Sequence, residues 1–158
     1  MKIYLETTVF NYFFDVERDG HADVTCLFQK IHLGEHDAYT SEYTAGELLS
    51  STEPKQSRMM ALIGEYNIKM LPITDESNQL ANLYVSEGIV PPRFRLDGAH
   101  IAIASMHGLD CVLSYNFQHI NRVKTKLMIE RVNRKKGYSG IVICTAREVL
   151  DDERYNDE

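Results

Sequence analysis

The sequence predicts an α/β protein, a three-layer sandwich in which helices cover both faces of a mostly parallel five-stranded sheet. Short apolar segments alternate with helically spaced apolar residues along the whole chain, which is typical of parallel strands joined by helices. The length of 158 residues, with 44% hydrophobic and 25% charged residues, suits one soluble domain with one core. We expect a single domain over residues 1–150 and a frayed acidic tail over residues 151–158.

The first half of the chain predicts three strands and four helices. Residues 2–5 alternate polar and apolar side chains and form the first strand, and the apolar, aromatic residues 9–14 form a short helix. Residues 22–33 form a longer helix, because apolar side chains recur there at helical spacing: Val24, Leu27, Phe28 and Ile31. A second strand over 38–40 is followed by a helix over 44–50. An amphipathic helix over 55–66, for which Pro54 suits the first turn, leads to a third strand over 69–73.

The second half continues the alternation. Residues 75–87 form a helix that Gly88 ends, and Pro91 and Pro92 form a rigid link. A helix over 98–107 leads into the fourth strand, residues 110–114. A basic helix over about 120–135 ends at Gly137, and residues 141–144 form the fifth strand.

Charge and cysteine content narrow the class of protein. The net charge is −6, yet residues 121–137 contain seven basic residues against one acid. Such a strip binds a polyanion or is a solvated helix face, and both interpretations stay open.

Three widely spaced cysteines without a CxxC pair indicate buried free thiols in a reducing cytoplasm: Cys26, Cys111 and Cys144. The absence of a bilayer-length apolar run, and of a signal-peptide stretch in MKIYLETTVF, favours a cytoplasmic protein without membrane contact.

Polar side chains recur at one end of the predicted strands. Glu6 follows the first strand, Glu47 lies in the helix after the second, Asp97 opens the helix before the fourth, and Asn116 follows the fourth. Open parallel sheets bind ligands beyond the carboxyl ends of their strands. Three carboxylates that converge there without basic partners repel one another, and Mg²⁺ or Mn²⁺ would remove that cost.

Each of these residues also has a structural explanation. Asp97 could cap its helix, and Thr44 with Glu47 fits a capping box. Glu6 could favour the first turn of the next helix, and Asn116 could be a turn residue.

Histidines and tyrosines add further alternatives. His100 sits among small apolar residues, where a packed histidine is expected. His119 follows the Asn-Phe-Gln turn and could donate to a phosphate or cap the next helix. Six tyrosines could stack on bases, although their strand and helix positions favour core packing: Tyr4, Tyr12, Tyr39, Tyr43, Tyr84 and Tyr115.

Four stretches in order carry a family resemblance: ETTV from Glu6, SEYTAGEL with Glu47, LDGAHIAIA with Asp97, and GLDCVLSYNFQHI with Asn116. Over nearly the whole chain they resemble a PIN domain, the fold of the VapC-type toxin ribonucleases of bacteria and archaea. The resemblance implies an acid cluster that binds Mg²⁺ or Mn²⁺, cleavage of RNA, a homodimer and a small antitoxin protein as partner.

By position, Glu6 matches the family's first acid, usually Asp, while Glu47 and Asp97 match the second and third. Asn116 stands where the fourth acid is usually Asp, as in a sub-group with Asn there, and Thr7 or Thr8 matches a hydroxyl position. Asn116 lowers the nominal charge of the site from −4 to −3. We therefore expect one metal to be held well, a second more weakly, and activity to be reduced without being lost.

The first functional hypothesis is a metal-dependent endoribonuclease acting on single-stranded RNA or an RNA loop. Glu6, Glu47 and Asp97 would hold the metal, and Asn116 would complete the catalytic set. The candidate substrate contacts are Thr7, Thr8, His119, Arg122, Lys124, Lys135 and Lys136. One alternative is a weak or inactive PIN-like module that binds RNA or a protein partner. Another is an unrelated α/β fold with a small-ligand site, although no GxGxxG or Walker sequence is present.

Overall fold

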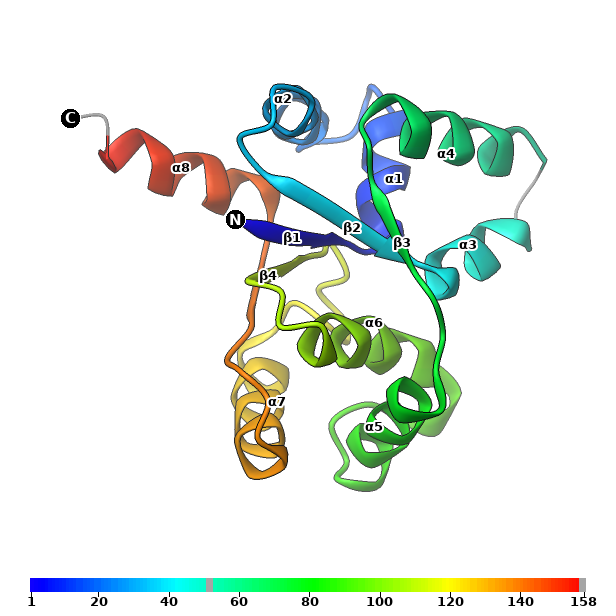
Figure 1. Cartoon of the computed structure of the whole chain (residues 1–158), viewed down its shortest axis with the longest axis vertical. Helices are drawn as coiled ribbons and strands as arrows, with labels where there is room; N and C mark the ends of the chain where they lie inside the picture. Colours follow the sequence, from blue (N-terminus) through cyan, green and yellow to red (C-terminus); the bar gives the residue numbers. More distant parts are fainter. Residues whose placement is uncertain (51–52, 157–158) are drawn as a thin grey trace.

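The protein is built on a five-stranded parallel sheet. The structure is a computed structural model that describes residues 1–50 and 53–156. The strands stand in the order β3-β2-β1-β4-β5, and each neighbouring pair is parallel (Figure 1). Their bounds are β1 Lys2–Leu5, β2 Asp37–Ser41, β3 Lys69–Leu71, β4 Cys111–Leu113 and β5 Val142–Cys144. The predicted α/β class with a parallel sheet is confirmed.

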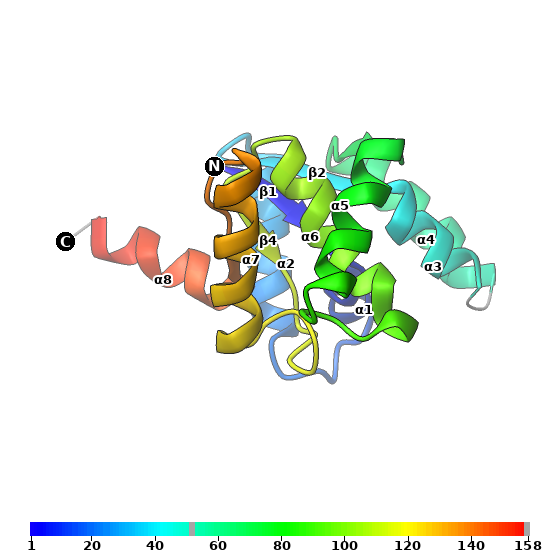
Figure 2. The same cartoon turned by 90° about the horizontal axis from the view of Figure 1, so that it is seen from below.

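Helices cover both faces of the sheet (Figure 1). One face carries α1 Thr7–Phe14, α2 His21–His32, α4 Glu53–Glu65 and α8 Ala146–Asn156. The other carries α5 Asp75–Ser86, α6 Arg95–Met106 and α7 Val123–Lys136 (Figure 2). Helix α3, Glu42–Leu49, follows β2 directly and contributes side chains to both cores, and a short 3-10 turn, Pro92–Phe94, precedes α6.

The alternation of side chains along each strand divides the core in two. Ile3 and Leu5 pack with α1 and α2 on one face, whereas Tyr4 between them faces the core under α6. Cys111 and Leu113 repeat this pattern next to β1. The central strands therefore bury both faces, as a sheet covered by two helical layers requires.

Several helix starts differ from the sequence prediction, and the differences concern the site. Helix α1 begins at Thr7, α3 at Glu42 with Ser41 as its N-cap, and α6 at Arg95. Asp97 is therefore inside the first turn of its helix and does not cap it. Thr44 lies within α3, so the capping box proposed for Glu47 is wrong.

The C-terminal segment is more ordered than its composition indicated. Residues 151–156 continue α8 rather than fraying, because Glu153 pairs with Lys30 at 2.9 Å and with His36 at 2.5 Å. Residues 157 and 158 of the predicted tail lie outside the described residues. The prediction of three buried thiols holds for Cys111 and Cys144 and is wrong for Cys26, which is exposed on α2. Over residues 1–50 and 53–156, no helix is long and apolar enough to cross a membrane.

Glu153 should contribute measurably to stability. Burial raises the pKa of Glu153, but Lys30 and His36 outweigh it and hold the pKa below its usual range. We expect Glu153→Gln to lower the free energy of unfolding by about 0.5–1 kcal/mol at pH 7. Because the folded pKa is the lower one, this contribution is complete above the ordinary Glu pKa of about 4.3 and disappears as pH falls through the folded value. Denaturant unfolding at pH 7 and at a pH below the folded pKa of Glu153 measures this contribution. Asp151→Asn, whose carboxylate pairs with Arg154 of the same helix, is the control, and an equal loss in the two variants would contradict the role of Glu153.

Candidate functional site at the carboxyl edge of the sheet

Glu6 is a buried carboxylate at the centre of the carboxyl edge. It follows β1 directly as the N-cap residue of α1, and only 2% of its surface is exposed. One of its oxygens accepts hydrogen bonds from the Thr8 hydroxyl at 2.5 Å and from the Ser114 hydroxyl at 2.8 Å. Because Ser114 follows β4, Glu6 is tied to the end of the neighbouring strand.

Asp97 reaches the same edge from α6. The chain passes from α6 through a turn into β4, so the start of α6 lies at the carboxyl ends of the strands. The Asp97 carboxylate contacts Nδ1 of His119 at 2.8 Å, and His119 lies in the loop that follows β4. Asp97 therefore lies at the edge where the start of α6 meets the loop after β4.

Glu47 is held by a buried hydrogen-bonded chain that begins in the sheet. Ser41 contacts the Tyr4 hydroxyl at 2.7 Å, Tyr4 contacts Nδ1 of His100 at 2.7 Å, and Nε2 of His100 contacts the Glu47 carboxylate. His100 is fully buried, as the sequence predicted. Its pairing with Glu47 was not foreseen, because the two residues lie on different helices.

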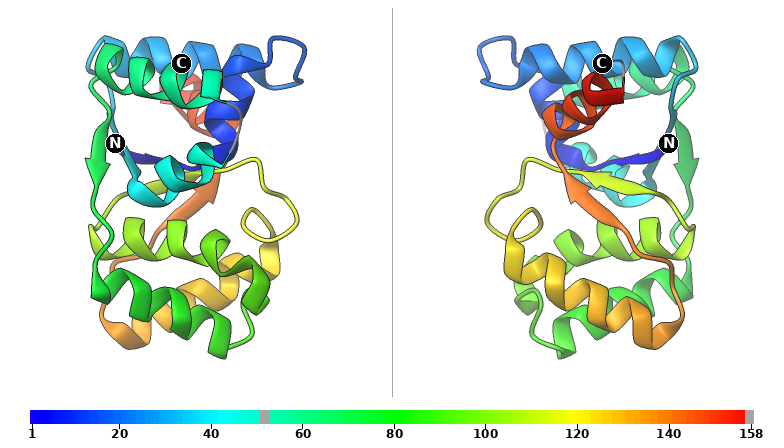
Figure 3. Two further views of the ribbon diagram at one scale, coloured as in Figure 1. Left: turned by 90° about the vertical axis from the view of Figure 1, so that its right-hand side faces the viewer. Right: turned by 90° about the vertical axis from the view of Figure 1, so that its left-hand side faces the viewer.

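The loop from Ser114 to Arg122 connects these groups. The Tyr115 N–H donates to the Thr8 hydroxyl at 2.8 Å, and the Asn116 N–H donates to Ser114 at 3.0 Å. The Asn116 side-chain oxygen accepts the His119 N–H at 3.0 Å, so the turn role proposed for Asn116 is correct. In Figure 3 this loop (yellow) projects at one edge of the molecule beside α1 (dark blue).

Burial and the two histidines set the charge of the carboxylates. Burial raises the pKa of Glu6 and of Asp97, against the opposing effects of His100 on the first and His119 on the second. Burial also raises the pKa of Glu47, but the hydrogen bond and charge of His100 outweigh it, so the net pKa is lowered. Burial alone would lower the pKa of His100; the Tyr4 oxygen and the carboxylates of Glu47 and Glu6 raise it well above its ordinary value.

The three carboxylates were assumed from the sequence to have no basic partners, and the structure shows that this assumption is wrong. The carboxylates do have basic partners, because His100 faces Glu47 and His119 faces Asp97. His100, whose pKa is raised, thus supplies part of the neutralisation that the sequence assigned to a cation, while His119 hydrogen-bonds to Asp97. Within the described part of the chain, no group of three or more His, Cys, Asp or Glu side chains is gathered as a metal site.

The donor set nevertheless suits a hard divalent cation in its chemistry. Carboxylate and hydroxyl oxygens meet at this edge, and Mg²⁺ is commonly held by one or two carboxylates completed by water and substrate phosphate. The buried hydroxyl of Thr7 lies beside the Glu47 carboxylate and lowers its pKa. Glu6 with either Glu47 or Asp97 is therefore a sufficient protein contribution, and a preformed cage of three carboxylates is not required.

The candidate substrate contacts separate into near and far groups. Thr7, Thr8 and His119 lie at the carboxyl edge. Arg122 is exposed at the start of α7, whereas Lys136 is the last residue of that helix. A helix of 14 residues spans about 20 Å, so Lys135 and Lys136 lie far from the carboxylates and Arg122 and Lys124 lie near them.

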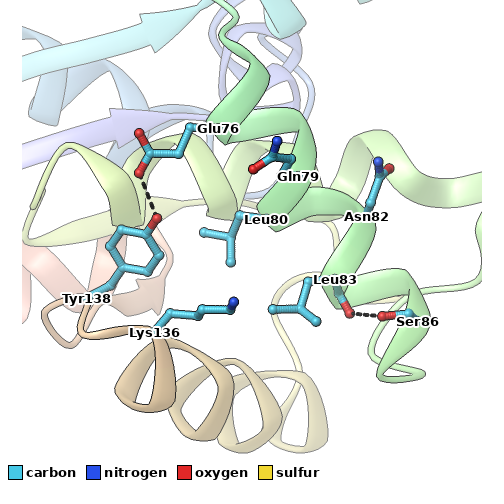
Figure 4. Close-up of a pocket in the computed structure, with 8 residues that line it drawn as sticks. All are labelled: Glu76, Gln79, Leu80, Asn82, Leu83, Ser86, Lys136 and Tyr138. Atoms are coloured by element: carbon cyan, nitrogen blue, oxygen red, sulfur yellow. Dashed lines mark hydrogen bonds between the residues drawn. The ribbon is translucent and has the colours of Figure 1, made fainter.

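Lys136 instead lines a cavity between α5 and the end of α7. This cavity has a volume of about 410 Å³, with Leu80 and Leu83 in its wall (Figure 4). The Tyr138 hydroxyl donates to Glu76 at its rim at 2.8 Å. Apart from Lys136, the cavity is lined by none of the predicted site residues.

Two comparisons with solved structures give the fold relationship. A chain of VapBC2 from Rickettsia felis, solved with a DNA fragment from the promoter, superposes with a TM-score of 0.56 and 12% identity, covering 90% of this chain and 97% of that one. VapC20 of Mycobacterium tuberculosis, described as a sarcin-ricin loop cleaving toxin, gives a TM-score of 0.56 and 11% identity, with 74% and 92% covered. No protein-family model and no curated protein sequence matches the chain. The chain therefore has the fold of VapC toxins.

Proposed function

We propose that the protein is an endoribonuclease that depends on Mg²⁺ or Mn²⁺ and hydrolyses phosphodiester bonds of single-stranded RNA or RNA loops. The observation that carries the proposal is the placement of Glu6 and Asp97 at the carboxyl edge of a sheet with the fold of VapC toxins, with Glu47 close enough to Glu6 to raise its pKa. Similarity to a sarcin-ricin loop cleaving toxin and to a VapBC complex supports RNA as substrate and a small antitoxin protein as partner; a second copy of the chain is the other partner in the proposal.

Each residue has its own role in the proposed reaction. A bound divalent cation would lower the pKa of a water molecule and stabilise negative charge that develops on the phosphate. Glu6 and Asp97 would hold the cation, and Glu47 would be directed towards it by His100. The His119 side chain, which is partly exposed, would orient the phosphate.

Incubation of a mixed-sequence single-stranded RNA with the protein tests the proposal. We expect cleavage with Mn²⁺ or Mg²⁺ and none with EDTA. Absence of cleavage at every metal concentration would leave the second function, a non-catalytic module that binds RNA or a protein. The pairing of Glu47 and Asp97 with histidines and the neutral Asn116 are the observations that favour that alternative.

Asn116 should weaken the site without disabling it, as in a PIN sub-group with Asn at this position. Asn116→Asp keeps the acceptor for the His119 N–H and adds a charge worth on the order of 1 kcal/mol to a nearby cation. We expect cleavage to reach its maximum at a several-fold lower Mn²⁺ concentration. Asn116→Ala removes the acceptor and should lose activity. If Asn116→Asp instead gains cleavage from an inactive wild type, Asn116 is a disabling residue.

Phosphate binding should depend on the near end of α7. We expect the double variant of Arg122→Gln and Lys124→Gln to reduce the salt dependence of RNA binding, by roughly 0.7 in slope for each lost phosphate contact. The matched far pair, Lys135→Gln and Lys136→Gln, should change the slope less, because it lies about 20 Å along the helix. Filter binding between low and high salt measures both. Equal slopes in the wild type and both double variants would show that the basic residues of 121–137 form a solvated helix face.

A further inference from the structure

A second cavity lies beside the candidate site, and aromatic rings form much of its wall. Its volume is about 480 Å³. The residues that matter here are Tyr12, Asp19, Asp23, Tyr115, Phe117 and Arg147. Two of them, Tyr115 and Phe117, flank Asn116 in the loop after β4, so this Phe117 pocket opens next to the proposed reaction centre.

The aromatic part of the Phe117 pocket is held in place. Tyr12 and Tyr115 stack with ring centroids 3.9 Å apart, and the Tyr115 hydroxyl accepts the Ala146 N–H at 3.3 Å. Phe117 stands edge-on to Tyr115 at 6.3 Å, and 56% of its surface is exposed. No other phenylalanine of the described residues is exposed to this degree. An aromatic face in a fixed loop is thus presented to solvent.

The polar part offers hydrogen-bond acceptors at the rim. Asp23 pairs with Arg147 at 3.1 Å, which leaves that guanidinium and carboxylate as a neutral pair. Asp19 is exposed at the loop before α2. A carboxylate beside aromatic rings is the arrangement that receives N–H groups from the edge of a base stacked on those rings.

Electrostatics favours base contacts over phosphate contacts in the Phe117 pocket. Among the described residues that line it, the one basic side chain is that of Arg147, which already pairs with Asp23, while Asp19 adds a negative charge. The pocket therefore offers no unpaired cation to a phosphate. Base stacking on an aromatic ring is worth roughly 1–3 kcal/mol, so the exposed ring of Phe117 supplies affinity without a phosphate contact.

We propose that the Phe117 pocket binds one unpaired nucleobase of the RNA, stacked on Phe117 and presenting N–H donors to Asp19, as the Watson–Crick edge of guanine does. The proposal rests on the proposed function for its choice of RNA. It makes Phe117 and Asp19 determinants of specificity: a base must leave its helix to enter, so paired RNA is excluded and the cleaved bond lies near an unpaired guanine.

Binding in EDTA tests the pocket separately from cleavage. The chain contains no tryptophan, so Phe117→Trp places one fluorescent reporter in the pocket. We expect single-stranded RNA containing guanine to quench this fluorescence, and the same RNA in a duplex, or a backbone without bases, to leave it unchanged. Leu33→Trp, at a position 72% exposed at the end of α2, away from the carboxyl edge, is the matched control and should respond to neither. Equal quenching in both variants, or equal quenching by duplex RNA, would overturn the proposal.

Two further variants give the affinity and the base preference. Phe117→Ala should weaken binding of a labelled single strand about tenfold, and Asp19→Asn should weaken guanine-containing strands about tenfold while sparing strands without guanine. Binding without cleavage in Mn²⁺ would reject the proposed nuclease and keep the pocket. Cleavage with unchanged affinity and cleavage position in Phe117→Ala would reject the pocket and keep the nuclease. If neither the fluorescence of Phe117→Trp nor the binding assay responds to RNA, the proposed base pocket is wrong, and the exposed Phe117 ring is then a contact for a protein partner.

Discussion

Replacing Asp97 with Asn should reduce RNA cleavage by roughly 10²–10³-fold, the loss seen when one preorganised electrostatic group is removed from an active site. Asp97 lies at the edge where Glu6 and the loop after β4 meet, and its carboxylate is half-buried. The amide keeps the shape and can still contact His119. The variant should therefore fold normally, with a melting temperature close to that of the wild type.

A matched substitution shows whether the loss of cleavage in Asp97→Asn comes from the position of the residue or from the change in net charge. Asp37 is an exposed carboxylate at the start of β2, at the opposite edge of the sheet. Asp37→Asn changes the net charge by the same amount and should leave cleavage unchanged. If Asp97→Asn cleaves as fast as the wild type, Asp97 is not part of a catalytic site. If it unfolds, the main role of Asp97 is the contact that joins α6 to the loop.

Replacing His100 with Leu should cost roughly 10–100-fold in cleavage or in apparent Mn²⁺ affinity, as the loss of a residue that orients a metal ligand typically does. Leu preserves much of the buried volume but removes the contacts to Tyr4 and Glu47. His100 touches neither substrate nor cation in this account, so it is a positioning residue. Glu47 without it is free to turn into solvent.

The conservative variant separates positioning from stability. His100→Gln keeps a donor that can reach Glu47 and should recover part of the lost cleavage, while Tyr4→Phe removes the link between His100 and Ser41 and should give an intermediate loss. Cleavage is measured across a Mn²⁺ series below the melting temperature of each protein. Unchanged cleavage in folded His100→Leu would show that Glu47 does not need its partner.

The positions of the site residues could be predicted from the sequence because they follow from topology. Parallel strands bring their carboxyl ends to one edge, so a residue directly after a strand, such as Glu6, or in the loop that follows it, such as Asn116, is placed once the strand is recognised. Asp97 follows from the same rule, since the helix that leads into β4 starts at that edge. None of these placements depends on a contact between side chains.

The partners of the carboxylates could not be predicted, because they are tertiary contacts between distant segments. Glu47 and His100 lie 53 positions apart, and Asp97 and His119 lie 22 apart. The sequence placed His119 near the site, after the Asn-Phe-Gln turn, but gave no signal that it pairs with Asp97 or that His100 pairs with Glu47. Helix α8 was missed for a similar reason: its acidic residues indicated a frayed tail, and Glu153 is ordered by Lys30 and His36 of another segment.

Anomalous scattering of Mn²⁺ in crystals of the wild-type protein shows directly whether the carboxylates hold a metal. We expect one strong peak at the carboxyl edge of the sheet, within ligand distance of Glu6 and of at least one of Glu47 and Asp97, and its loss in Asp97→Asn. A crystal grown at millimolar Mn²⁺ with no peak at these carboxylates, or with a peak only elsewhere on the protein, would rule out the proposed metal site.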